Sequence, residues 1–85
     1  MYILVSVCER DIGIPTKHKT FELAQRAMFE EIAPIFGTPT DEIAELAKDL
    51  NQYDEVDGDN GITLTKDGAY GERYHNNYDW KIFKI

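Results

Sequence analysis

The stretch from residue 62 to residue 85 reads ITLTKDGAYGERYHNNYDWKIFKI and decides the fold. Apolar and aromatic residues alternate with polar ones along it, and two short polar segments, 66–68 and 75–77, interrupt the alternation. A period of two is typical of β-strands, and Asp, Asn and Gly are typical of tight turns. The stretch therefore predicts three antiparallel strands, which are residues 62–65, 69–74 and 78–85.

A further β-rich run lies at the start of the chain, in residues 2–8. Both of its alternating faces are largely apolar, which predicts a central strand that is covered on at least one side. Gly13 and Pro15 then break the pattern, so we expect residues 12–19 to form a loop or a ragged strand.

The apolar period becomes helical between these two β-rich regions. Thr20 is the expected N-cap of a helix over residues 21–33, which Pro34 and Gly37 end or tighten in its last turn. A second helix opens within residues 38–41. Its apolar stripe consists of Ile43, Leu46, Ala47 and Leu50. The order β-α-α-β-β-β predicts an α+β fold with a helical hairpin on one face of an antiparallel sheet.

The size and composition indicate one domain, residues 1–85. Apolar residues make up 42 % of the chain, and 9 Lys and Arg stand against 16 Asp and Glu, for a net charge of −7. Such a composition is typical of a globular domain and argues against a separate cofactor domain or a generally basic nucleic-acid binder. Because a domain this small has a thin margin of stability, either a monomer or a homodimer is expected.

The single cysteine, Cys8, excludes an intrachain disulfide and favours a reducing compartment. The apolar opening is too short to span a bilayer and lacks the positive flank of a signal peptide. These features predict a cytoplasmic protein without a membrane partner.

The negative charge is concentrated in residues 38–60, which we call the acidic lobe. It contains one basic residue, Lys48, against eight acidic ones. Such a lobe attracts basic surfaces and repels nucleic acid, so we predict a protein partner with a basic surface and no direct nucleic-acid binding. The predicted partner-binding residues are Asp41, Glu42, Glu45, Asp49, Tyr53, Asp54, Glu55, Asp57 and Asp59, with Tyr53 as an amphipathic anchor. The alternative is a solvated face that only keeps the protein soluble.

Residues 55–62 resemble the first eight positions of an EF-hand calcium loop, with carboxylates at alternate positions. The resemblance implies a calcium- or metal-responsive domain, which is the alternative function. However, the twelfth position is Lys66 rather than a bidentate Glu, and Glu55 replaces the first Asp. An acidic turn that leads into a strand accounts for the same residues, so no metal site and no cofactor are predicted.

Catalysis by Cys8 with His18 or His75 is a further alternative. Neither Cys8 nor the only serine, Ser6, stands at a glycine-flanked strand-to-helix turn, where a hydrolase nucleophile is found. We therefore predict a protein that is not an enzyme and has no catalytic residues.

Aromatic and basic residues interleave near the C-terminus, as they do in proteins that stack single-stranded nucleic acid. They are Tyr70, Tyr74, Tyr78, Trp80 and Phe83, with Arg73, Lys81 and Lys84. Core packing is the better interpretation of Trp80 and Phe83, because aromatic residues are favoured in strands. Tyr70 and Tyr74 are expected to be exposed.

Three segments, MYILVSV at the start, FELAQRAM in residues 21–28 and YDWKIFKI at the end, resemble small uncharacterised proteins of gut bacteria and their phages or mobile elements. Such proteins are similar in size and acidity to anti-CRISPR and other anti-defence inhibitors. This resemblance implies a non-enzymatic inhibitor that docks its acidic lobe on a basic, nucleic-acid-binding surface of a bacterial protein. It transfers no functional residue. An uncharacterised housekeeping domain is the remaining alternative.

Overall fold

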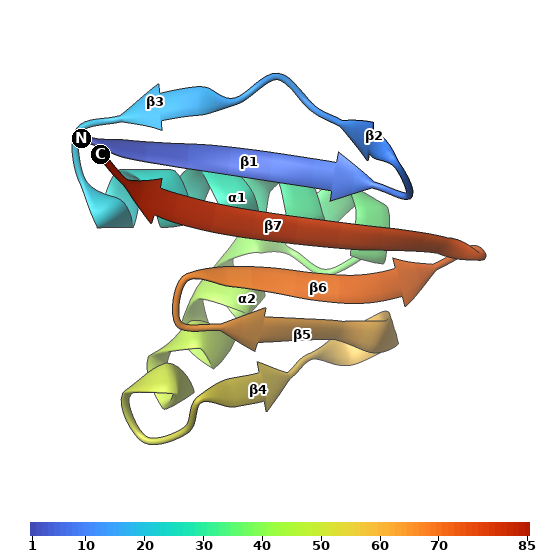
Figure 1. Cartoon of the computed structure of the whole chain (residues 1–85). Coiled ribbons are helices and arrows are strands. Elements are labelled where there is room, and N and C mark those ends of the chain that lie inside the picture. Colours follow the sequence, from blue (N-terminus) through green and yellow to red (C-terminus); the bar gives the residue numbers. More distant parts are fainter.

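Seven strands form one antiparallel sheet, and two α-helices cover one of its faces, in the computed structural model of residues 1–85 (Figure 1). The predicted α+β class and the order of the main elements are confirmed. In chain order the elements are β1 (Tyr2–Cys8), β2 (Asp11–Ile12), β3 (Thr16–His18), α1 (Phe21–Phe36), α2 (Thr40–Ala47), the 3-10 helix η1 (Lys48–Asn51), β4 (Glu55–Asp57), the 3-10 helix η2 (Asp59–Gly61), β5 (Ile62–Thr65), β6 (Gly68–Arg73) and β7 (Asn76–Lys84).

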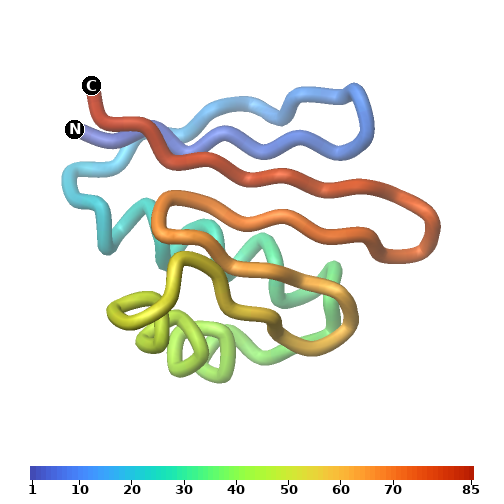
Figure 2. The backbone as a smooth tube through the Cα atoms, turned by 60° about the horizontal axis from the view of Figure 1, so that its bottom comes forward, coloured from blue at the N-terminus to red at the C-terminus, as the bar shows by residue number.

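The first and last long strands lie side by side in the middle of the sheet. The strand order is β2-β1-β7-β6-β5-β4, and β3 pairs with β1 on the same side as β2. Strand β1 pairs with β7 along its whole length, from Tyr2 opposite Lys84 to Cys8 opposite Tyr78. Both termini therefore lie at the same end of the sheet (Figure 2). The prediction of a central strand over residues 2–8 is confirmed.

Three short strands, β2, β3 and β4, add to the predicted topology. Residues 12–19 were expected to form a loop or a ragged strand, and residues 16–18 within them are β3, hydrogen-bonded to β1. The acidic loop expected between residues 51 and 61 contains β4, which pairs with β5 at the edge of the sheet. Three residues are too few to show a period, so their pairing partner decides their conformation. The last turn is also shifted, because β7 begins at Asn76 rather than at residue 78.

Helix α1 is capped where the sequence predicts but runs three residues further than expected. Oγ1 of Thr20 accepts a hydrogen bond from the amide of Leu23 at 3.1 Å, as in an N-cap. The helix continues through Pro34, whose fixed φ is compatible with a helix, and ends at Gly37 with φ +67°. The extra turn places Phe36 in the core, where it is fully buried.

The core lies between the helices and the inner face of the sheet, which is the face that the helices cover. The ring of Phe36 meets Trp80 edge-on at 6.2 Å between centroids, and Nε1 of Trp80 donates to Oε1 of Glu31 at 3.2 Å. Trp80 is buried, as predicted, and Ile82 on the same face is buried as well. Phe83 is 49 % exposed, so the prediction that it belongs to the core is wrong. Successive strand residues point to opposite faces, so Phe83 lies on the uncovered outer face.

Candidate functional site: an acidic lobe with an apolar cavity

The acidic lobe lies at one end of the molecule. Residues 38–60 fold into α2, η1, β4 and most of η2, which lie together in the lower part of Figure 1. Strand β4 forms the edge of the sheet opposite to β2. The rest of the chain is nearly neutral, because residues 1–37 carry 4 basic and 5 acidic groups and residues 61–85 carry 4 basic and 3 acidic groups. The excess negative charge is therefore confined to one edge of the sheet and the helix beside it.

Three carboxylates of the lobe form ion pairs on the surface. The pairs are Asp41 with Arg26 at 3.5 Å, Glu45 with Lys48 at 2.8 Å, and Asp54 with Lys66 at 3.5 Å. The hydrogen bond to Glu45, together with its negative charge, raises the pKa of Lys48. All six side chains are at least half exposed, and such pairs contribute little to stability. These three carboxylates are therefore held only weakly by their partners.

Two further carboxylates are held by hydroxyl groups on neighbouring strands. The hydroxyl of Tyr70 donates to Oε1 of Glu55, and Oγ1 of Thr63 donates to Oδ1 of Asp57, both at 2.9 Å. The hydrogen bond to Glu55 is the main cause that raises the pKa of Tyr70, and burial and the charge of Glu55 add to it. Both carboxylates project from β4 with fixed partners, so their positions are set by the sheet.

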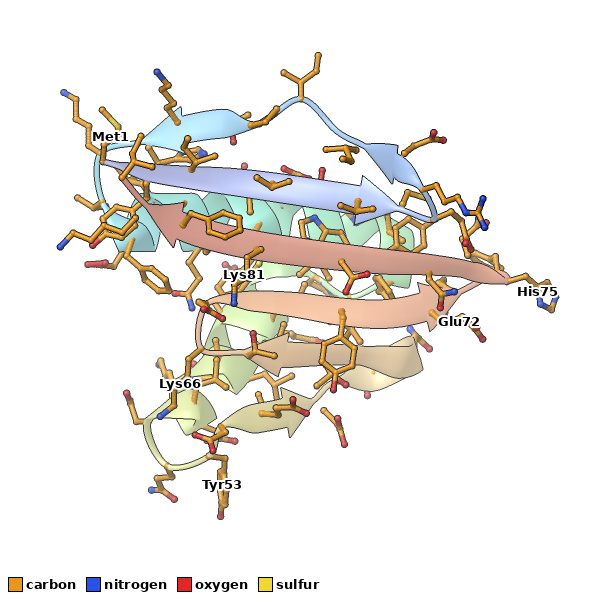
Figure 3. The ribbon with its side chains drawn as sticks, viewed as in Figure 1. Met1, Tyr53, Lys66, Glu72, His75 and Lys81 are labelled. Carbon is orange, nitrogen blue, oxygen red and sulfur yellow. The ribbon has the colours of Figure 1, made fainter.

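The other four predicted residues have no hydrogen bond or ion pair from their side chains. They are Glu42, Asp49, Tyr53 and Asp59. Tyr53 is 59 % exposed and points away from the body of the protein (Figure 3). The nine residues thus share one end of the molecule, but they do not converge on a single point.

A cavity of about 160 Å³ opens within the lobe, between α2 and the segment from β4 to β5. Its apolar walls come from Ile43, Leu46, Ile62 and Leu64. The exposed residues Glu42 and Asp59 also line it, so they stand where the cavity meets solvent, whereas the carboxylate of Asp57 bonds to Thr63 on the outer face of the sheet. The cavity therefore combines an apolar floor with a negatively charged mouth.

Thr38 lines the same cavity and was missed by the sequence reasoning, which treated it only as part of a helix start. It is 8 % exposed, and its Oγ1 is buried without a hydrogen-bond partner. A buried hydroxyl without a partner is unfavourable, and most buried polar groups are paired. No local signal marks Thr38, because its burial depends on the packing of α2 against the sheet.

The backbone around Gly58 fixes the wall of the cavity opposite α2. A Cβ atom at Gly58 would lie 2.8 Å from Cγ2 of Ile62 and 2.9 Å from Cδ2 of Leu46, so a larger residue there would force these side chains to shift. The amide of Gly58 donates to the carbonyl of Ile62 at 2.8 Å. Asn60, with φ +63°, donates from Nδ2 to the carbonyl of Phe36 at 2.7 Å. This loop is therefore tied both to β5 and to α1.

The carboxylates of residues 55–62 do not gather as the calcium-loop resemblance would require. No group of three or more His, Cys, Asp or Glu residues is arranged to hold a metal ion. Glu55 and Asp57 are extended in β4, whereas Asp59 lies in η2. Lys66, at the position of the bidentate ligand, pairs with Asp54.

Cys8 and the two histidines are separated by the strand arrangement. His18 lies opposite Tyr2, at the other end of β1 from Cys8, and its Nε2 bonds with Oγ1 of Thr16 at 2.8 Å. His75 lies exposed at the tip of the β6–β7 hairpin (Figure 3). No hydrogen bond joins Cys8 to either ring, so the structure offers no cysteine–histidine pair.

The C-terminal aromatic residues are distributed over three places rather than one stacking platform. Tyr78 and Trp80 stack against each other at 5.9 Å on the inner face, while Phe83 lies on the outer face. Tyr70 and Tyr74 are exposed, as predicted, and the guanidinium of Arg73 lies 4.7 Å from the centre of the Tyr74 ring.

No known protein family, curated protein or solved structure matches this chain. No helix has the length and apolar character needed to cross a membrane. The candidate site therefore rests on the geometry and charge of the acidic lobe itself.

Proposed function

We propose that the protein is a non-enzymatic binding module whose acidic lobe docks on a basic surface of a bacterial protein. The observation that carries the proposal is the excess of seven negative charges within residues 38–60, at one edge of the sheet. Concentrated charge of one sign speeds the encounter with a surface of opposite sign and disfavours wrong partners. The surface that fits best is one that otherwise holds nucleic acid, because such surfaces are strongly basic.

The lobe combines fixed and exchangeable carboxylates. Glu55 and Asp57 are held by hydroxyl groups of the sheet, so their position costs little entropy on binding. Asp41, Glu45 and Asp54 are held only by exposed ion pairs, which a partner's arginine or lysine side chains can replace. The exposed ring of Tyr53 adds apolar area beside these charges.

The resemblance in size and acidity to anti-defence proteins supports a role as an inhibitor carried by a phage or mobile element. In that role the lobe occupies the basic surface and excludes nucleic acid from it. We place this encounter in the cytoplasm, in keeping with the single free cysteine.

Capture from a bacterial lysate with three baits tests the proposal. The baits are the natural protein, a lobe variant with Glu45→Lys and Asp49→Lys, and a control with Asp11→Lys and Glu72→Lys, which makes the same change of net charge outside the lobe. We expect a partner that the natural and control baits retain, that the lobe variant loses, and that added duplex DNA displaces. Retention of the same proteins by all three baits would contradict the proposal.

A further inference from the structure

We propose that the outer face of the sheet around β1 is the interface of a reversible dimer, in which a second copy of this chain covers it. The inference goes beyond the proposed function and does not depend on it. Leu4 is buried beneath the helices, so the residues next to it in alternation on β1 point to the opposite, uncovered face (Figure 1). These residues are Ile3, Val5 and Val7, and they form an apolar stripe along the strand.

The register of the sheet extends the stripe onto both neighbouring strands. Phe83 of β7 lies directly opposite Ile3, and Ile12 of β2 lies directly opposite Val7, so both project from the outer face. Ile12 is 71 % exposed and Phe83 is 49 % exposed, although they adjoin other apolar side chains. A continuous exposed apolar surface of this kind is typical of a protein–protein interface.

The distribution of charge favours a second copy in one orientation. The stripe lies in the nearly neutral part of the chain, whereas the acidic lobe lies at β4, four strands away from β1. A twofold axis along β1 places the two lobes at opposite edges of the dimer, about 40 Å apart at roughly 4.8 Å per strand. Their repulsion is then screened, since the Debye length is about 8–10 Å at ordinary salt. An axis across the strands would instead place one lobe over the other.

The same axis makes the stripe complementary to itself. Each stripe residue of β1 then faces its own counterpart, so Val5 packs on Val5 of the second copy. The charged residues Lys17, Lys81 and Asp79 flank the stripe and fall at the rim of the interface, where water reaches them. Phe83 comes to lie across from Lys17 of the second copy, whose methylene stem and ammonium both suit an aromatic ring.

The size of the overlap indicates a weak dimer. It covers β1 and its neighbours on either side, about 15 Å across, over the length of β7, about 30 Å. This area is below the roughly 800 Å² that each partner contributes to a standard interface, and smaller interfaces are typical of reversible association. We therefore expect a Kd on the order of 10–100 µM, so that dilute protein is monomeric.

Sedimentation equilibrium of the natural protein and of two matched variants tests the inference. Val7→Lys places a charge on the twofold axis, and Thr65→Lys places the same charge on the outer face but outside the interface. Each introduced lysine lies opposite a carboxylate of its own chain, that of Asp79 or of Glu55, so both variants are expected to fold. Amide spectra establish that they do.

We expect the natural protein and Thr65→Lys to approach the mass of a dimer as the concentration rises beyond about 100 µM. We expect Val7→Lys to dimerise at least about tenfold more weakly, because two like charges would be buried against each other on the axis. Ile12→Lys, at an exposed position of the stripe on an edge strand, should weaken the dimer in the same direction.

The distance between spin labels on the two lobes tests the orientation. Asp54→Cys in a Cys8→Ala background carries one nitroxide on each lobe, at a side chain that is 96 % exposed. Double electron–electron resonance at high protein concentration should give a distance of about 40 Å or more. A distance below about 25 Å would place the lobes side by side and overturn the twofold axis along β1.

Two further results would overturn the dimer itself. One is a natural protein that stays monomeric at several hundred micromolar, and the other is a dimer that Val7→Lys weakens no more than Thr65→Lys does. Neither result bears on the proposed function, because capture of a basic partner depends on the charge of the acidic lobe and not on the outer face around β1.

Discussion

Nδ2 of Asn60 donates a hydrogen bond to the carbonyl of Phe36 at 2.7 Å, and this contact joins the acidic lobe to the end of α1. The last carbonyl groups of a helix lack partners within the helix, so the side chain satisfies one of them. Asn60 itself is left-handed, with φ +63°, a conformation that asparagine tolerates better than most residues. One residue therefore supports both the helix end and the loop that walls the cavity.

Replacing Asn60 separates its two contributions. Asn60→Gly keeps the left-handed backbone and loses the hydrogen bond, so we expect the free energy of unfolding to fall by about 1 kcal/mol. Asn60→Ala loses the hydrogen bond and also disfavours the left-handed backbone, so we expect the free energy of unfolding to fall by about 2–3 kcal/mol. Urea unfolding of the two variants measures the difference. If alanine were tolerated as well as glycine, the backbone conformation would have no role in stability.

The two aromatic residues Trp80 and Phe83 test the assignment of the sheet faces. Trp80→Ala removes a buried ring that contacts Phe36 and should cost about 3–5 kcal/mol, enough to unfold much of a small domain. Phe83→Ala acts on the same strand but on the uncovered face, so about 1 kcal/mol is expected. Thermal unfolding followed by circular dichroism compares them. Similar losses for both would mean that the outer face is covered in solution.

Thr38→Val replaces a buried hydroxyl that has no partner with a methyl group of similar size. Because the unsatisfied oxygen is unfavourable in the free protein, we expect the free energy of unfolding to rise by about 1 kcal/mol. Chemical unfolding of the variant and of the natural protein measures the difference. A destabilised variant would show that Oγ1 has a stabilising partner in solution.

Because of the Tyr70–Glu55 contact, we expect the free energy of unfolding to depend on pH in the alkaline range. The hydrogen bond to Glu55 favours the protonated phenol, so the pKa of Tyr70 lies above its ordinary value of 10.0. A raised pKa in the folded state means that the contact stabilises the protein below pH 10 and is lost as the pH rises through that pKa. The Cζ chemical shift of Tyr70 against pH measures it, and Glu55→Gln should lower the pKa. An unchanged titration in that variant would exclude Glu55 as the cause.

Most of the fold could be predicted because its long elements carry a clear period. The alternation in residues 62–85 and the helical spacing after Thr20 each depend on neighbours in the sequence. The short strands β3 and β4 could not be predicted, since their pairing with β1 and β5 is a long-range effect. Phe83 was assigned to the core because aromatic character alone does not tell which face of a strand is covered.

The candidate site, like the fold, could be predicted from the sequence only in part. The count of charges along the sequence shows that eight acidic residues are concentrated in one segment. The fold brings that segment to one edge of the sheet. The cavity was not visible in the sequence, because Thr38 and Gly58 lie twenty residues apart and meet only through the packing of α2. A buried hydroxyl without a partner is a property of the folded chain.

The association rate of the captured partner with the lobe variant, measured at several salt concentrations, tests the central claim most directly. Glu45 and Asp49 are exposed and lie off the apolar stripe, so reversing them to Lys should leave the fold intact. Electrostatic steering is screened over about 8–10 Å at ordinary salt. We expect association to slow by on the order of tenfold at low salt, with a flatter salt dependence, while Asp11→Lys with Glu72→Lys changes it far less. Equal slowing by both variants, or no slowing by either, would contradict the assignment of the acidic lobe as the binding surface.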